Sequence, residues 1–74
     1  MMPSIGRTVI YVQPASEQPV NGTREHPAIV THVWSETGVN LQVLFDAGPV
    51  EPRTSVVRDE TTSSAGCWKW PERT

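Results

Sequence analysis

Apolar and polar residues alternate most regularly between residues 26 and 48. Successive side chains of an extended chain point to opposite faces, so this alternation is typical of β-strands. In residues 28–34, one face carries Ile29, Thr31 and Val33. The opposite face carries Val30, His32 and Trp34. In residues 39–46, Leu44 interrupts the polar face, and one apolar face carries Val39, Leu41, Val43 and Phe45. The pattern predicts a β-hairpin whose turn, 35–38, has Gly38 at a positive φ.

Three further segments read as strands. Residues 6–12 place Val9 and Tyr11 on one face, and residues 54–57 are short and β-branched. Residues 67–72 place Trp68 and Trp70 on one face before Pro71 ends the ladder. Residues 13–27 contain three prolines and an Asn-Gly pair, which predicts a long loop without a ladder.

Five short strands without helical periodicity predict an all-β fold. We expect one domain over residues 1–74, a five-stranded antiparallel SH3-like barrel with a long loop after the first strand. Residues 1–5 and 73–74 are expected to be flexible. A five-stranded oligonucleotide-binding barrel is the alternative, although that fold usually needs a longer chain.

The chain is short enough that its stability needs an explanation. For 74 residues, apolar burial and conformational entropy nearly cancel. Cys67 is the only cysteine, so no intrachain disulfide forms, and His26 and His32 match no common metal-ligand spacing. We therefore expect a homo-oligomer, with an unaided fold as the alternative.

The charge and hydropathy patterns limit the classes of binding partner and the compartment that we expect. The net charge is -2 and no basic stripe is present, so we expect no duplex nucleic acid. No apolar run approaches the length of a membrane span, and the first residues lack the features of a signal peptide. A lone cysteine fits a reducing, cytoplasmic compartment.

The sequence shows no catalytic constellation. Cys67 lies two residues before Lys69, and Asp59 and Glu60 are adjacent carboxylates, but neither pattern supplies an activated nucleophile or a defined acid–base pair. We expect a protein that is not an enzyme and uses no metal or cofactor.

Binding chemistry is better represented. Three tryptophans are more than so small a core holds easily, so at least one is expected at a pocket or subunit interface. Arginine and hydroxyl groups near residue 54 suit phosphate, and a histidine beside a tryptophan suits a base. The candidate ligand-binding residues are Trp34, His32, Arg53, Thr54, Ser55, Arg58, Trp68, Trp70 and His26. Core packing of the aromatics and ordinary solvation of the charges remain open alternatives.

The segments GRTVIYV, HPAIVTHVW, VNLQVLFD, TSVVRDE and GCWKWPE together resemble a family of small phage and prophage proteins. The resemblance covers most of the chain outside residues 13–25 and brings no assigned activity or catalytic residue. It implies a viral protein that acts in the host bacterial cytoplasm or in the virion. Small phage proteins often act by stoichiometric binding, which suggests an oligomeric inhibitor of host defence that sequesters a nucleotide-type signal. A virion structural or assembly protein and an inhibitor of a host protein are the alternatives.

Overall fold

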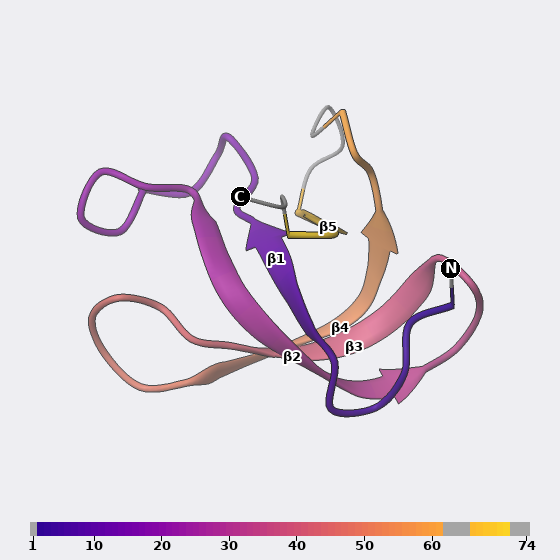
Figure 1. The fold of residues 1–74 in the computed structure, drawn as a ribbon. Coiled ribbons are helices and arrows are strands. Elements are labelled where there is room, and N and C mark those ends of the chain that lie inside the picture. The colour runs from indigo at the N-terminus through magenta and orange to yellow at the C-terminus, as the bar shows by residue number, and fades with distance from the viewer. Residues whose placement is uncertain (1, 62–65, 72–74) are drawn as a thin grey trace.

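The computed structural model describes residues 2–61 and 66–71 (Figure 1). Five strands follow one another along the chain: β1 (Thr8–Val12), β2 (Glu25–Val33), β3 (Gly38–Val43), β4 (Glu51–Arg58) and β5 (Cys67–Lys69). They form one closed barrel in the order β1-β2-β3-β4-β5. The all-β fold and the closed five-stranded barrel are as predicted, and the architecture fits a small SH3-like barrel. The predicted flexibility of residues 73–74 concerns positions outside the described residues.

The barrel closes through its shortest strand. β1 pairs with β2, β2 with β3 and β3 with β4, each antiparallel. β5 then pairs antiparallel with β1 and parallel with β4, where Val57 faces Cys67 and Arg58 faces Trp68. The parallel ladder is the one departure from the predicted antiparallel pattern. Closure leaves each of the five strands with two neighbours, which removes the exposed edges that invite aggregation.

The core is built from alternating residues of all five strands. Trp68 is its largest fully buried side chain, and its indole Nε1 donates a 2.8 Å hydrogen bond to the carbonyl of Thr37. The other buried apolar members are Val9, Tyr11, Ala28, Val30, Val39, Leu41, Val43 and Val56. The apolar faces predicted for residues 6–12 and 39–43 are therefore the inner faces of β1 and β3.

Two register shifts adjoin Asn40 of β3. The pairing of β2 with β3 shifts between Val30 and His32, so Thr31 is an extra residue on β2. The pairing of β3 with β4 shifts between Val39 and Leu41, so Thr54 and Ser55 together lie opposite Asn40. An extra residue of this kind is a β-bulge, which reverses the faces of the residues beyond it.

The first bulge corrects the faces predicted for residues 28–34. Val30 is fully buried, whereas His32 and Trp34 are exposed and Val33 packs against the core. The prediction that Val30 shares a face with His32 and Trp34 is wrong because the bulge lies between them. The expectation for Gly38 is also wrong. It begins β3 without a positive φ, and a Cβ there would lie 3.3 Å from Ser35 Oγ.

The long loop after β1 is shorter than predicted. β2 begins at Glu25, so residues 25–27 pair with β1 instead of belonging to the loop, and Pro27 faces Ile10. Within the loop, Asn21 and Gly22 form a tight turn with positive φ values of 51° and 82°. Arg24 stabilises the loop by donating hydrogen bonds to the carbonyls of Pro14, at 2.7 Å, and Glu17, at 2.8 Å.

Among the described residues, no helix is long and apolar enough to cross a membrane.

Candidate binding surfaces

The structure distributes the predicted ligand-binding residues over three places. Three of them, His32, Trp34 and Ser55, lie together on the outer surface of β2–β4, with Thr54 exposed next to Ser55 in β4. His26 lies at the beginning of β2 beside Phe45, and Arg53 lies over the same Phe45 ring. Trp68, Trp70 and Arg58 lie where β4 meets β5. The residues between 53 and 58 that were predicted to form one phosphate-binding cluster therefore lie in three different places.

The outer surface of β2–β4 carries an exposed but fixed tryptophan. Trp34 is 63% exposed, and its Nε1 donates a 2.8 Å hydrogen bond to Asn40 Oδ1. The His32 ring lies edge-on to it, with ring centroids 4.2 Å apart. We call the group His32, Trp34, Asn40 and Ser55 the Trp34 platform. Its indole presents a large aromatic surface to solvent without being free to rotate away.

Asn40 connects the two bulges to this platform. The backbone N–H of Ser55 donates a 2.9 Å hydrogen bond to the same Asn40 Oδ1 that accepts from Trp34. Ser55 has a φ of 53°, a left-handed conformation that is rare outside glycine. The bulge on β4 thus turns an amide toward Asn40, and Asn40 in turn orients Trp34. Asn40 was not among the predicted site residues, because its role depends on bulges that alternation does not reveal.

The Trp34 platform contains no lysine, arginine, aspartate or glutamate side chain. The described arginine and lysine residues are engaged elsewhere: Arg53 with Glu51, Arg58 with Glu60 and Lys69 with Glu25. Arg7 lies over the Trp70 ring and Arg24 within the loop after β1. A ligand on the platform would therefore meet aromatic surface and neutral hydrogen-bonding groups.

Two of the three tryptophans serve the interior. Trp68 is fully buried, and Trp70 packs edge-on against it with ring centroids 5.1 Å apart. Arg7 covers Trp70, with its Cζ 5.3 Å from the ring centroid. Arg58 Nε donates to Glu60 Oε2, which also accepts the backbone N–H of Trp70. These groups hold β5 in place, which accounts for their chemistry without a ligand.

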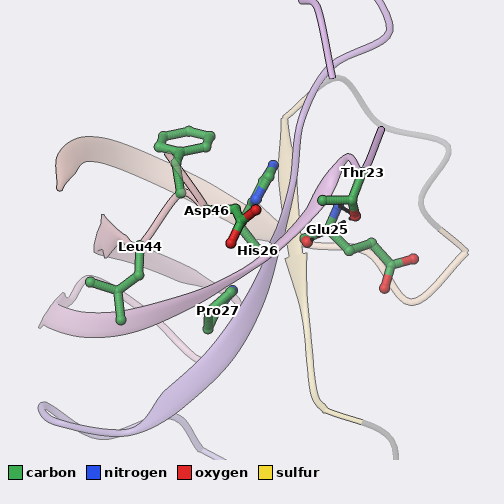
Figure 2. A pocket seen from close by; sticks show the side chains of 7 residues that line it. Thr23, Glu25, His26, Pro27, Leu44 and Asp46 are labelled. Atoms are coloured by element: carbon green, nitrogen blue, oxygen red, sulfur yellow. Dashed lines mark hydrogen bonds between the residues drawn. The ribbon is translucent and has the colours of Figure 1, made fainter. Parts of the chain in front are cut away.

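A pocket of about 390 Å³ lies at the beginning of β2 (Figure 2). We call it the His26 pocket. It is lined by residues that precede and begin β2 and by residues that follow β3: Thr23, Glu25, His26, Pro27, Leu44, Phe45 and Asp46. The two segments are joined by a 2.9 Å hydrogen bond from the Leu44 N–H to the Pro27 carbonyl. In the view of Figure 2, Asp46 and His26 lie at the centre of the pocket, with Leu44 and Thr23 on opposite sides.

His26 is 1% exposed, and its hydrogen bonding fixes its tautomer. Its Nε2 lies 2.9 Å from Gln13 Oε1, while Gln13 Nε2 donates to the carbonyl of Gln18. Gln13 therefore presents its oxygen to His26, so Nε2 carries the proton and Nδ1 the lone pair when the ring is neutral. Burial lowers the pKa of His26, and the Asp46 carboxylate opposes that change. The neutral ring is thus favoured.

The Nδ1 atom of His26 retains some contact with solvent although the side chain is almost fully buried. Among the described residues, no hydrogen-bond partner contacts Nδ1. Every buried side-chain nitrogen or oxygen in the described part of the chain has a partner, so Nδ1 must retain some contact with solvent. His26 is also one of the residues that line the pocket. Asp46, which the sequence did not single out, lines the same pocket; its place after an alternating strand gave no signal.

The thiol of Cys67 is poorly suited to nucleophilic catalysis. Cys67 is fully buried, and burial, aided by the negative charge of Asp59, raises the pKa of its thiol. A raised pKa leaves little thiolate for nucleophilic attack. In residues 2–61 and 66–71, no cluster of His, Cys, Asp and Glu side chains is arranged to hold a metal ion.

Comparison of the chain with protein-family models, with curated proteins and with solved structures finds no significant match.

Proposed function

We propose that this protein is a binding module that acts by binding its ligand without catalysing a reaction. We propose that the Trp34 platform is the surface that contacts the ligand. The observation that carries the proposal is the exposed Trp34 indole, which is anchored by Asn40 and flanked by His32. An exposed aromatic side chain normally loses conformational freedom on binding. Here the hydrogen bond has already restricted it, so less entropy is lost when a ligand arrives.

The ligand class that suits this surface is a planar ring, and a nucleotide-type molecule is our first candidate. Every nucleobase has a flat π face, and stacking on an aromatic side chain contributes about 1–3 kcal/mol per base. Neutral polar groups beside the indole, such as the Ser55 hydroxyl and the Asn40 amide, offer hydrogen bonds to base edges. Recognition through the base also fits the engagement of the described cations elsewhere.

The biological role proposed with this ligand is sequestration. A module that binds a nucleotide-type signal without converting it lowers the free concentration of that signal. Together with the resemblance to small phage proteins, this supports a phage-encoded inhibitor of host defence acting in the bacterial cytoplasm. Association of several copies would multiply the number of platforms per assembly.

A second candidate function is a protein contact, either with a host protein or with virion components. One observation favours it: Val57 is 53% exposed and pairs with Gly38, whose carbonyl accepts the Trp34 N–H. Tryptophan is enriched at the centres of protein interfaces, and an exposed valine nearby adds apolar area of the kind that the buried part of an interface contains.

Ligand binding distinguishes these candidates. Purified protein is titrated with mononucleotides, cyclic mononucleotides and cyclic dinucleotides, and tryptophan fluorescence is followed, since Trp34 is the most exposed of the three indoles. Native mass spectrometry of protein from phage-infected cells identifies any nucleotide that copurifies. We expect quenching with one nucleotide class, a weak dependence on salt, and affinity about 10- to 100-fold lower in Trp34→Ala, which lacks the fluorescent reporter and is measured by isothermal titration calorimetry.

Two control variants sharpen the result. Val50→Ala truncates an apolar side chain that is 49% exposed in the segment before β4, away from the platform, and should bind as the wild type does. Val57→Ala should leave nucleotide affinity unchanged while weakening a protein contact. Unaltered nucleotide affinity in Trp34→Ala, or the absence of binding to every nucleotide class tested, would remove the nucleotide proposal.

A further inference from the structure

The His26 pocket gathers hydrogen-bond acceptors without a matching donor. Asp46 Oδ2 accepts a 2.6 Å hydrogen bond from Asn21, but no described lysine or arginine forms an ion pair with this carboxylate. His26 adds the lone pair of Nδ1, which has no partner among the described residues. Glu25 adds a second carboxylate, one oxygen of which accepts from Lys69 at 3.1 Å.

The rest of the pocket wall is apolar. Leu44, Pro27 and Phe45 line it together with the acceptors. The Phe45 ring is held in place on two sides: His26 lies with its ring centroid 4.6 Å away, and Arg53 Cζ lies 5.5 Å from the Phe45 centroid. Since Arg53 is also paired with Glu51, its charge is already balanced. The pocket therefore combines a rigid apolar wall with one uncompensated negative charge.

We propose that the His26 pocket binds the cationic head of a basic side chain, lysine or arginine, presented by a partner protein. The head donates hydrogen bonds to Asp46 and to His26 Nδ1, and the methylene stem lies against Leu44, Pro27 and Phe45. The pocket volume of about 390 Å³ lies within the range of pockets that enclose small ligands. This site is separate from the Trp34 platform and goes beyond the proposed function.

The negative charges around the pocket oppose the binding of an anionic ligand. A phosphate or carboxylate would meet Asp46 and Glu25 at the opening and would find a lone pair, not an N–H, at Nδ1. An ammonium or guanidinium group has only donors and a positive charge, so it complements both the Asp46 carboxylate and the lone pair of His26 Nδ1, whereas the Glu25 carboxylate points away from them (Figure 2). A buried acceptor that receives a charged donor forms a stronger hydrogen bond than the same group in water.

Single capped amino acids test this pocket directly. N-acetyl-lysine methylamide and N-acetyl-arginine methylamide are titrated into isotope-labelled protein at neutral pH, and the resonances of His26 and Phe45 are followed by NMR. N-acetyl-norleucine methylamide has the same kind of stem without a charged head. We expect saturable shifts at His26 and Phe45 with at least one of the two cationic probes and none with norleucine.

Charge-neutralising variants assign the effect to Asp46. Asp46→Asn keeps an acceptor for Asn21 and should weaken binding of the cationic probe about tenfold. Glu36→Gln removes the same charge from the exposed turn after β2 and should leave the affinity unchanged. The free spectrum of each variant shows whether the fold is intact. If Asp46→Asn is perturbed, Glu25→Gln serves instead and should weaken binding about threefold.

The remaining outcomes are decisive. Equal shifts with norleucine would mean that the pocket is only an apolar groove, and equal losses in Asp46→Asn and Glu36→Gln would mean that only the overall charge matters. Either result, or the absence of saturable shifts with both cationic probes, overturns the proposal. Trp34→Ala should bind the cationic probes as the wild type does, so a failure of the Trp34 platform does not affect this test.

Discussion

At the scale of single residues, the two histidines of β2 show how position determines chemistry. They are six residues apart on one strand, which corresponds to about 20 Å of extended chain. His26 is buried against Phe45 and hydrogen-bonded to Gln13, whereas His32 lies exposed against Trp34. The sequence treated both as candidates for one ligand site. The structure places them in different surroundings, and burial lowers the pKa of His26.

His26 should make stability depend on pH. Its pKa is lower in the folded protein than the value of 6.5 expected when it is unfolded. As the pH falls below about 6.5, the unfolded chain takes up a proton before the folded one does, so the free energy of unfolding decreases. The decrease is at most about 1.4 kcal/mol per pH unit and ends below the folded-state pKa. Urea denaturation at a series of pH values measures it.

Matched variants separate this effect from other titrations. His26→Gln should flatten the pH dependence between neutral pH and the folded-state pKa. His32→Gln is the composition-matched control, because it removes the other, exposed histidine and leaves the hydrogen bond between His26 and Gln13 in place. An identical slope in His26→Gln and the wild type would contradict the assignment.

At the scale of secondary-structure elements, the two bulges around Asn40 determine the outer surface. They expose both His32 and Trp34, and the bulge on β4 brings the Ser55 amide to Asn40. Ser55 adopts its left-handed conformation at some energetic cost, because its Cβ crowds the backbone there. The bulge is therefore a place where a local conformational preference yields to the geometry of the sheet.

Glycine substitutions in β4 should have opposite effects at neighbouring positions. Ser55→Gly relieves the left-handed strain and should raise the free energy of unfolding by about 0.5–1 kcal/mol. Thr54→Gly, at the adjacent exposed position with an ordinary φ, should lower it by about the same amount, since glycine has more freedom to lose on folding. Chemical denaturation of both variants checks the pair. Destabilisation of Ser55→Gly to the same extent as Thr54→Gly would show that the strain is absent.

Alternation along the chain predicted the strands because it reports directly on which residues are buried. Val9, Tyr11, Leu41 and Val43 are core residues, as their spacing required. Bulges leave no mark in such a pattern, so the outward turn of His32 and the role of Asn40 were missed. The extension of β2 to Glu25 was missed because prolines normally avoid central ladders, whereas Pro27 is accommodated within β2.

The candidate sites were only partly predictable for a related reason. Trp34 and its neighbour His32 were among the candidates named from residue type and spacing, but the sequence left open which of the three tryptophans is exposed. The His26 pocket joins residues about twenty positions apart, and Asp46 became relevant only through that contact. Arg53 and Arg58 were grouped because they are near in sequence, but the structure pairs them with different carboxylates.

At the scale of the whole molecule, the single chain has the accessible surface and the radius of gyration expected for a folded chain of its size. Its accessible surface is 4622 Å², and a monomer of this mass is expected to expose about 4,500 Å². Its radius of gyration is 11.3 Å, close to the value of about 11 Å expected for a folded chain of this length. Association of copies stays a prediction, and it would join closed barrels through their outer faces.

Dilution tests whether the fold depends on such association. Because each barrel completes its own core, we expect the protein to stay folded over about a hundredfold dilution, with a thermal midpoint that is constant wherever native mass spectrometry detects no oligomers. A midpoint that falls on dilution would show that partner copies supply part of the folding free energy. Trp34→Ala is the companion variant, since it should reduce association without lowering the midpoint of the diluted protein.

The closing strand has a consequence for how the chain is made in the cell. β5 bridges β1 and β4 and carries Trp68, the largest buried side chain. A nascent chain that has emerged from the ribosome only as far as β4 lacks both that side chain and the ladder that seals the first strand. The apolar residues of its inner surface then stay exposed to water until the residues around 68 leave the exit tunnel. The final step of folding therefore follows the synthesis of those residues.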